Sequence, residues 1–135
     1  MRRKTKTETK SIERKKVMLV EDSPAERNHI ALMIRDVYPH VDIFQYSSGF
    51  EALRFIRDRK YDLIVTDINI PDLSGFELIK FIKQEPTNKS TSIIVVSVES
   101  SKEDIQRAVN LGADEYIVKP VYEDRFKMIV SKYLL

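Results

Sequence analysis

Cysteine is absent from this sequence, and histidine occurs only twice, at His29 and His40. The lack of cysteine excludes disulfide bonds, thiol catalysis and cysteine-based zinc sites. Two scattered histidines do not supply the ligands of a histidine-built metal centre. We interpret them as a helix-surface residue and a loop residue.

Long hydrophobic runs are absent as well. No stretch approaches the roughly 18 apolar residues of a membrane-spanning helix. The apolar run behind the basic N-terminus, Val17–Val20, is shorter than the about 7–15 apolar residues that a signal peptide requires. We therefore expect a soluble, cytoplasmic protein without a transmembrane segment.

Charged residues are divided unevenly along the 135-residue chain. Residues 1–16 contain eight basic and two acidic side chains, whereas residues 17–135 contain 15 basic and 19 acidic ones. We predict a basic, flexible N-terminal extension over residues 1–15 and one domain over residues 16–135. We interpret the extension as a solvated arm; contact with nucleic acid, acidic lipid or an acidic partner is the alternative. It has no aromatic residue to stack on bases, and we do not expect the domain itself to bind nucleic acid.

Short apolar runs alternate with stretches that have apolar residues at helical spacing. We predict strands over residues 17–20, 41–46, 61–66, 93–96 and 116–118, and a closing helix over residues 122–135. Four other helices are predicted to begin after serines that have an acidic residue three positions later, as in a capping box; these are Ser23, Ser48, Ser74 and Ser101. Glu26 is the capping-box glutamate expected for the first helix. Strands without period-two alternation, separated by helices, predict an α/β fold with a parallel sheet buried on both faces.

Polar residues follow four of the five predicted strands. In chain order they are Glu21 with Asp22, then Asp67, Ser97 and Lys119. Ligand sites of open parallel sheets lie beyond the carboxyl ends of the strands. The pattern therefore predicts that three carboxylates, a hydroxyl and an amine meet at one edge of the sheet.

Three carboxylates at one edge repel each other, by about 4 kcal/mol for a pair at 4 Å and an effective dielectric constant of about 20. A divalent cation removes this cost, and a ligand set made only of oxygens favours Mg²⁺ or Mn²⁺ over zinc. One carboxylate can remain as a nucleophile, while Lys119 and Ser97 are suited to hold phosphoryl oxygens.

Each residue also has a simpler interpretation when it is taken alone. Glu21 and Asp22 lead into a helix N-terminus, where the helix dipole favours acidic residues. Asp67 can be a turn residue, Ser97 a strand-end cap and Lys119 a solvated surface lysine. Their joint occurrence at neighbouring strand ends favours a common site.

Four segments closely resemble the receiver domain of bacterial two-component response regulators, in the order and spacing of that family. The segments are VMLVEDS (17–23), DLIVTDINIPDLSG (62–75), IVVS (94–97) and GADEYIVKP (112–120). The resemblance covers about residues 16–135 and is to single-domain members of the chemotaxis-regulator type. It implies a doubly wound (βα)5 flavodoxin-like fold, with a five-stranded parallel sheet in the order 2-1-3-4-5.

The resemblance also implies the roles of the metal-site residues. Asp67 is the expected phosphoacceptor, and Lys119 is expected to pair with Asp67 or with its phosphate. Asp22 is the expected direct carboxylate ligand of Mg²⁺, with Glu21 acting through water. Asp67 and the backbone carbonyl of Asn69 are the other expected ligands.

Further implied roles concern switching. Ser97 and Tyr116 are the expected switch residues, and the Lys119–Pro120 peptide bond is expected to be cis. Ser97 replaces the commoner threonine and Val98 the usual alanine, while Glu21 is a frequent variant of aspartate. These changes remove none of the chemistry, so we expect an active receiver.

Two more positions of the family pattern, occupied here by Asn69 and Glu99, tune self-dephosphorylation. We expect Asn69 and Glu99 to orient or admit the attacking water, so that the phosphoryl group is fairly short-lived.

By resemblance, the chain accepts a phosphoryl group from a sensor histidine kinase or a phosphotransfer protein. It then controls a downstream target through the face formed by helix 102–111, strand 116–118 and the closing helix. We expect a phosphoacceptor rather than an enzyme, with limited self-phosphorylation from small donors and self-dephosphorylation. We also expect a monomer or a phosphorylation-dependent dimer.

Two other function classes were weighed. A haloacid-dehalogenase-type phosphatase needs a second aspartate two residues after its nucleophile, and Asn69 cannot donate a proton as a carboxylic acid does. A phosphorylation-independent adaptor would bind its partner equally well with and without phosphate.

Overall fold

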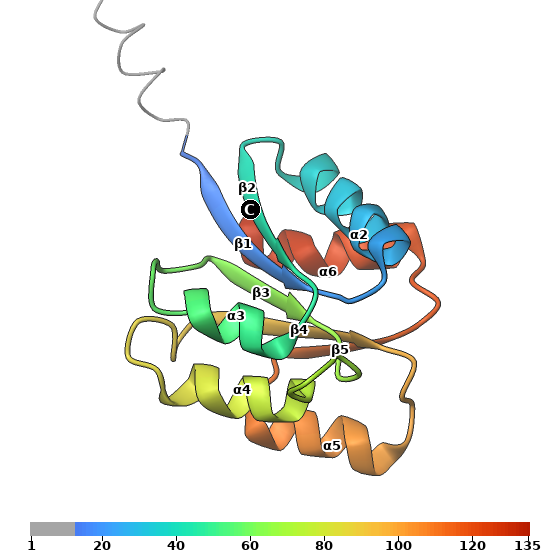
Figure 1. The fold of residues 1–135 in the computed structure, drawn as a ribbon. Helices are drawn as coiled ribbons and strands as arrows, with labels where there is room; N and C mark the ends of the chain where they lie inside the picture. The colour runs from blue at the N-terminus through green and yellow to red at the C-terminus, as the bar shows by residue number, and fades with distance from the viewer. Residues whose placement is uncertain (1–12) are drawn as a thin grey trace, which may run out of the picture.

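The computed structural model describes residues 13–135 (Figure 1). In this range, five strands alternate with five helices. The strands are β1 (Lys15–Val20), β2 (Val41–Tyr46), β3 (Leu63–Thr66), β4 (Ser92–Ser97) and β5 (Glu115–Val118). The helices are α2 (Pro24–Val37), α3 (Gly49–Phe55), α4 (Gly75–Gln84), α5 (Lys102–Leu111) and α6 (Glu123–Leu134). Of the predicted extension over residues 1–15, residues 1–12 lie outside the described residues.

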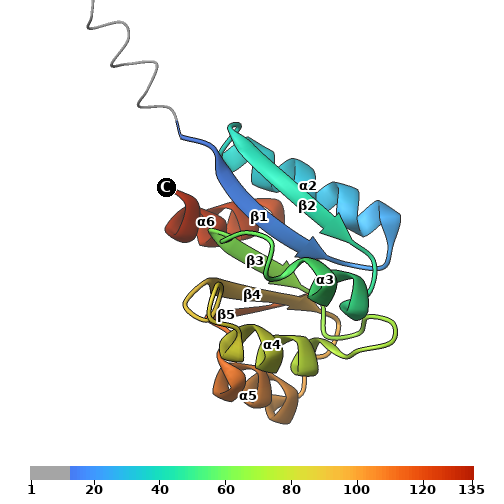
Figure 2. The ribbon, with the colours of Figure 1, turned by 60° about the vertical axis from the view of Figure 1, so that its left-hand side comes forward.

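The five strands form one parallel sheet in the order β2-β1-β3-β4-β5, which confirms the predicted topology. Helices α2 and α6 cover one face, and α3, α4 and α5 cover the other (Figures 1 and 2). Alternate residues of β1 face two cores: Val17 and Leu19 pack with α2 and α6, whereas Met18 and Val20 pack on the opposite side. Burial on both faces explains the continuous apolar runs within β1, β3 and β4.

Four helices begin at the predicted serines. The hydroxyl oxygens accept the backbone N–H three residues later at 3.4, 3.2, 3.3 and 3.1 Å for Ser23, Ser48, Ser74 and Ser101. These bonds satisfy N–H groups that have no partner within the helix. They fix where the helices start, and so where the preceding strand-end loops lie.

Four strands differ from their predicted bounds. Strand β4 also includes Ser92 and Ser97, strand β5 also includes Glu115, and the larger differences are in β1 and β3. Strand β1 begins at Lys15, where Lys15 pairs with Val41 of β2, so the parallel ladder includes polar residues that precede the apolar run. The preceding Arg14 forms an ion pair of 2.7 Å with Asp42. Strand β3 begins at Leu63, because the N–H of Tyr61 donates instead to the side chain of Asn88 at 2.9 Å.

Within residues 13–135, no helix is both long and apolar enough to cross a membrane.

Candidate functional site

The carboxyl ends of β1, β3, β4 and β5 bring the predicted site residues to one edge of the sheet. The registers align Val20 with Thr66 and Ser97 with Val118, so Glu21, Asp67 and Lys119 each follow directly at that edge. Relative exposure is 2% for Glu21, 5% for Asp67 and 0% for Ser97. Burying a polar group costs free energy unless it has a hydrogen-bond or ion-pair partner, so we expect these side chains to have such partners.

Lys119 is the centre of this cluster. Its ammonium nitrogen, Nζ, lies 2.7 Å from Asp67 Oδ2 and 2.9 Å from Glu21 Oε1, and it also contacts Glu26 Oε1. Burial disfavours the charged lysine, but the hydrogen bonds to the three carboxylates outweigh it and raise the pKa of Lys119. Lys119 is therefore a fixed positive charge beside Asp67.

Burial and hydrogen bonding also have opposing effects on Glu21. Burial raises the pKa of the Glu21 carboxyl, and the nearby charge of Asp67 adds to this effect, while hydrogen bonds from Lys119 and from the Ser23 N–H lower it. A second positive charge at this edge would relieve the crowding of carboxylates.

The Asp67 carboxylate is oriented by its own loop. Asp67 Oδ1 accepts the N–H of Asn69 at 2.9 Å, while Oδ2 faces Lys119. Gly75, at the start of α4, packs against this loop: a Cβ there would lie 2.3 Å from the Asp67 carbonyl oxygen and 2.6 Å from Ile68 Cα. Gly75 was not predicted to belong to the site, although it directly follows the capping serine Ser74.

The predicted metal ligands are only partly assembled. Glu21 and Asp67 come together, but Asp22 is exposed and has no hydrogen bond or ion pair within the described range. No group of three or more His, Asp or Glu side chains among residues 13–135 lies close enough to hold a metal ion. Glu21 and Asp67 offer only carboxylate oxygens, the donor chemistry that Mg²⁺ and Mn²⁺ prefer, but in this arrangement these oxygens pair with Lys119.

The predicted switch and tuning residues meet at Glu99. The N–H of Glu99 donates to Ser97 Oγ at 3.2 Å, and its carbonyl accepts the hydroxyl of Tyr116 at 2.7 Å. Its side chain accepts Asn69 Nδ2 at 3.1 Å, which joins the loops after β3 and β4. The structure thus brings Ser97, Tyr116, Asn69 and Glu99 into one network.

The Lys119–Pro120 peptide bond is cis, as the resemblance implies. The N–H of Lys119 donates to the Ser97 carbonyl at 2.8 Å. This bond ties the loop after β5 to the end of β4.

One residue of the cluster was predicted in a different role. Glu26 was expected to close a capping box by accepting the N–H of Ser23. Instead, Glu21 Oε2 accepts that N–H at 3.1 Å, and the Glu26 carboxylate reaches Lys119. No local sequence signal could have indicated this pairing, because it depends on a contact between the first turn of α2 and the residue that follows β5.

Comparison with known proteins identifies the family. Residues 17–131 match the family model described as the response regulator receiver domain. The signal transduction histidine-protein kinase BarA of Escherichia coli strain K12 is 29% identical over 117 residues, which are 87% of this chain and 12% of the kinase. The chain therefore spans a small part of such relatives.

Two solved structures show the same fold. The phosphorylated cyanobacterial phytochrome response regulator RcpA is 28% identical, with a TM-score of 0.78 over 89% of this chain and 91% of that one. The receiver domain of the sensor histidine kinase PA1611 from Pseudomonas aeruginosa PAO1, with a magnesium ion coordinated in its active-site cleft, is 22% identical. Its TM-score is 0.79 over 90% of this chain and 98% of that one. Given the family match, the strand order and the strand-end cluster, the chain belongs to the response regulator receiver domain family.

Proposed function

We propose that this chain accepts a phosphoryl group on Asp67 from a sensor histidine kinase or a phosphotransfer protein. The observation that carries the proposal is the pairing of buried Asp67, at the carboxyl end of β3, with Lys119 Nζ at 2.7 Å. The phosphorylated state of RcpA and the histidine kinase activity named for BarA support it.

In the proposed transfer, an Asp67 carboxylate oxygen attacks the phosphorus of a phosphohistidine. The new P–O bond forms as the P–N bond breaks, and the imidazole nitrogen keeps the electron pair. Lys119 faces the charge that develops on the phosphoryl oxygens. The N–H of Asn69 holds Asp67 Oδ1, so that the attacking carboxylate keeps one orientation.

We propose Mg²⁺ as the cofactor, with Mn²⁺ as an alternative. The residues that would hold it are Glu21, Asp22 and Asp67, with the backbone carbonyl of Asn69. The ion supplies positive charge that neutralises phosphoryl oxygens during transfer. The magnesium-containing receiver domain of PA1611 supports this assignment.

The output is proposed to be a shift in the α5-β5-α6 surface. Ser97 and Tyr116 are both hydrogen-bonded to the Glu99 backbone. A phosphoryl group that draws the Ser97 hydroxyl toward Asp67 would therefore shift Glu99, and with it the carbonyl group that accepts the Tyr116 hydroxyl. This face has exposed apolar side chains suited to a downstream target, at Val118 and Tyr122. It also has a pocket of about 270 Å³ that Tyr116 lines. A monomer or phosphorylation-dependent dimer, located in the cytoplasm, stays a prediction.

We propose limited self-phosphorylation from small donors, together with self-dephosphorylation, rather than enzymatic turnover. Because Asn69 and Glu99 are hydrogen-bonded to each other beside Asp67, they are placed to orient or admit water. The phosphoryl group is expected to decay within minutes to a few hours after the donor is removed. Its lifetime can be followed by intact-protein mass spectrometry, and a lifetime of many hours would contradict this expectation.

Phosphotransfer profiling tests the proposed function. The chain is mixed with each autophosphorylated histidine kinase of the source cell in the presence of Mg²⁺. We expect rapid transfer from one kinase or a few, at rates far above the rest. Transfer from none of them would contradict the proposal, whereas transfer that leaves the affinity for a partner unchanged would favour the adaptor alternative.

A further inference from the structure

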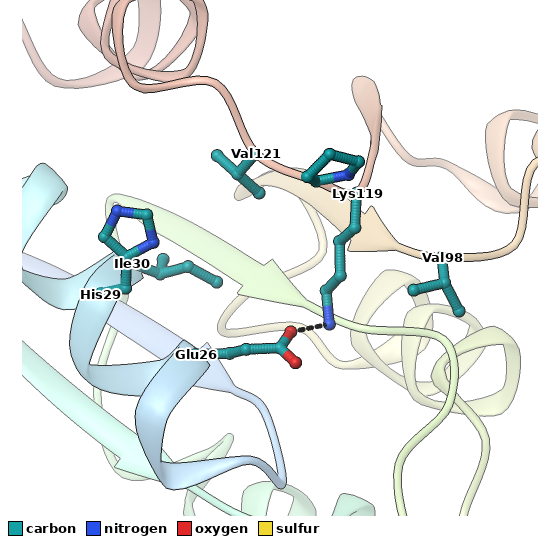
Figure 3. Close-up of a pocket in the computed structure, with 7 residues that line it drawn as sticks. Glu26, His29, Ile30, Val98, Lys119 and Val121 are labelled. Atoms are coloured by element: carbon teal, nitrogen blue, oxygen red, sulfur yellow. Dashed lines mark ion pairs between the residues drawn. The ribbon is translucent and has the colours of Figure 1, made fainter.

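Glu26 is placed unusually for a residue in the first turn of a helix. It occupies the third position of α2, but its carboxylate extends to Lys119 and not back to the N-terminus of its own helix (Figure 3). The equivalent glutamate of α3, Glu51, does accept a backbone N–H in front of its helix, from Ser47 at 2.8 Å. Glu26 does not have to accept the N–H of Ser23, because the Glu21 carboxylate already accepts it.

Three carboxylates surround the Lys119 ammonium. Its nitrogen donates hydrogen bonds to Glu21 and Asp67, and it forms an ion pair with Glu26. The side chains of Glu21 and Asp67 are 2% and 5% exposed, but that of Glu26 is 49% exposed. Because the Glu26 carboxylate is already half in contact with water, it is the partner that can leave Lys119 most easily.

There is room for this release. Glu26 and Lys119 form the polar end of a pocket of about 450 Å³ (Figure 3). The rest of the lining consists of His29, Ile30, Val98, Pro120 and Val121. A Glu26 side chain that leaves Lys119 can turn into the open pocket without entering the core.

A phosphoryl group on Asp67 brings new negative charge and oxygen acceptors to Lys119. Glu26 pairs with the same ammonium and adds a negative charge beside Asp67, where the phosphodonor must approach. We propose that Glu26 is a positioning residue that competes with the phosphoryl group for Lys119 and so restrains phosphorylation of Asp67. This inference rests on the proposed function.

The test compares Glu26→Gln with the wild type and with Glu77→Gln. Glu77 occupies the same third position in α4, is exposed, and has no salt bridge within the described residues; the net charge changes equally in both variants. Each protein is treated with acetyl phosphate and Mg²⁺. An Asp67 oxygen attacks the phosphorus, the P–O bond to the acetyl group breaks, and acetate leaves. The rate is measured by intact-protein mass spectrometry, with thermal unfolding as a check on folding.

Glu26→Gln is expected to react about two to five times faster than the wild type at low salt, a modest factor because the carboxylate is half exposed to water. Glu77→Gln is expected to match the wild type. In about 1 M salt, where charges are screened within about 3 Å, the acceleration should shrink; a purely structural role would not depend on salt in this way.

Three results would overturn the inference. One is a Glu26→Gln rate equal to or below that of the wild type, and another is an acceleration that persists unchanged in high salt. A wild-type chain that accepts no phosphoryl group would overturn the proposed function as well, which separates the two failures.

Discussion

Lys119→Met is expected to lower the free energy of unfolding at pH 7 by about 3–5 kcal/mol, the range for breaking a buried ion pair by removing one partner. The substitution keeps much of the side-chain volume but leaves Glu21 and Asp67 buried without their shared cation. Equilibrium unfolding in urea measures the loss.

The matched control is Lys132→Met. Lys132 also pairs with a glutamate, Glu115, at 3.1 Å, but its side chain is 57% exposed. An exposed pair contributes about 0–1 kcal/mol, so this variant should stay within that range. A Lys119→Met loss no larger than that of the control would contradict the account of the cluster.

The stability difference should also depend on pH. Burial already raises the pKa of the Glu21 carboxyl above its ordinary value, and removing Lys119 takes away a hydrogen bond that lowers it. A carboxyl with a raised folded pKa costs stability above that pKa, and the cost is relieved as pH falls through it and the group is protonated. The deficit of Lys119→Met should therefore shrink on acidification from pH 7 toward about 4.3, the unfolded-state value for glutamate.

Gly75→Ala is expected both to destabilise the fold and to disturb the site. The added Cβ would meet backbone atoms of Asp67 and Ile68 at 2.3 and 2.6 Å, so the loop must move; overpacking of this kind costs about 1–3 kcal/mol. Because misplacement of a reacting group by about 1 Å can cost about 100-fold in rate, labelling of Asp67 by acetyl phosphate should slow at least about tenfold.

Gly112→Ala separates the two effects. Gly112 has a φ of 124°, and the three atoms nearest to a Cβ there all belong to the flexible side chain of Lys83, the first at 2.6 Å. Backbone strain should cost about 1–3 kcal/mol, but the labelling rate of the folded protein should not change. Equal labelling rates for the two alanine variants would show that Gly75 does not position Asp67.

The sequence was sufficient to predict the sheet and most of the site, because both depend on regular patterns. Apolar runs buried on both faces identified the strands, and the serine caps located four helix starts. Parallel strands place their carboxyl ends at one edge, so residues at strand ends, such as Asp67 and Lys119, could be placed together without knowing any side-chain conformation.

Features that depend on side-chain conformation could not be predicted. The strand ends place Lys119 near the carboxylates, but they do not show that it pairs with Glu21 and Glu26 and so occupies the centre of the cluster. That arrangement explains why Glu26 leaves its predicted capping position. Likewise, Lys15 belongs to β1 because its backbone pairs with that of Val41 in β2. Its polar side chain gives no indication in the sequence that it lies in a strand.

The central claim is that Asp67 receives the phosphoryl group, and site-resolved labelling tests it most directly. The wild type, Asp67→Asn and, as a control, Asp58→Asn at an exposed position are each incubated with acetyl phosphate and Mg²⁺ and weighed intact. We expect one added phosphoryl group on the wild type and on Asp58→Asn, and none on Asp67→Asn. Stoichiometric labelling of Asp67→Asn would contradict the central claim.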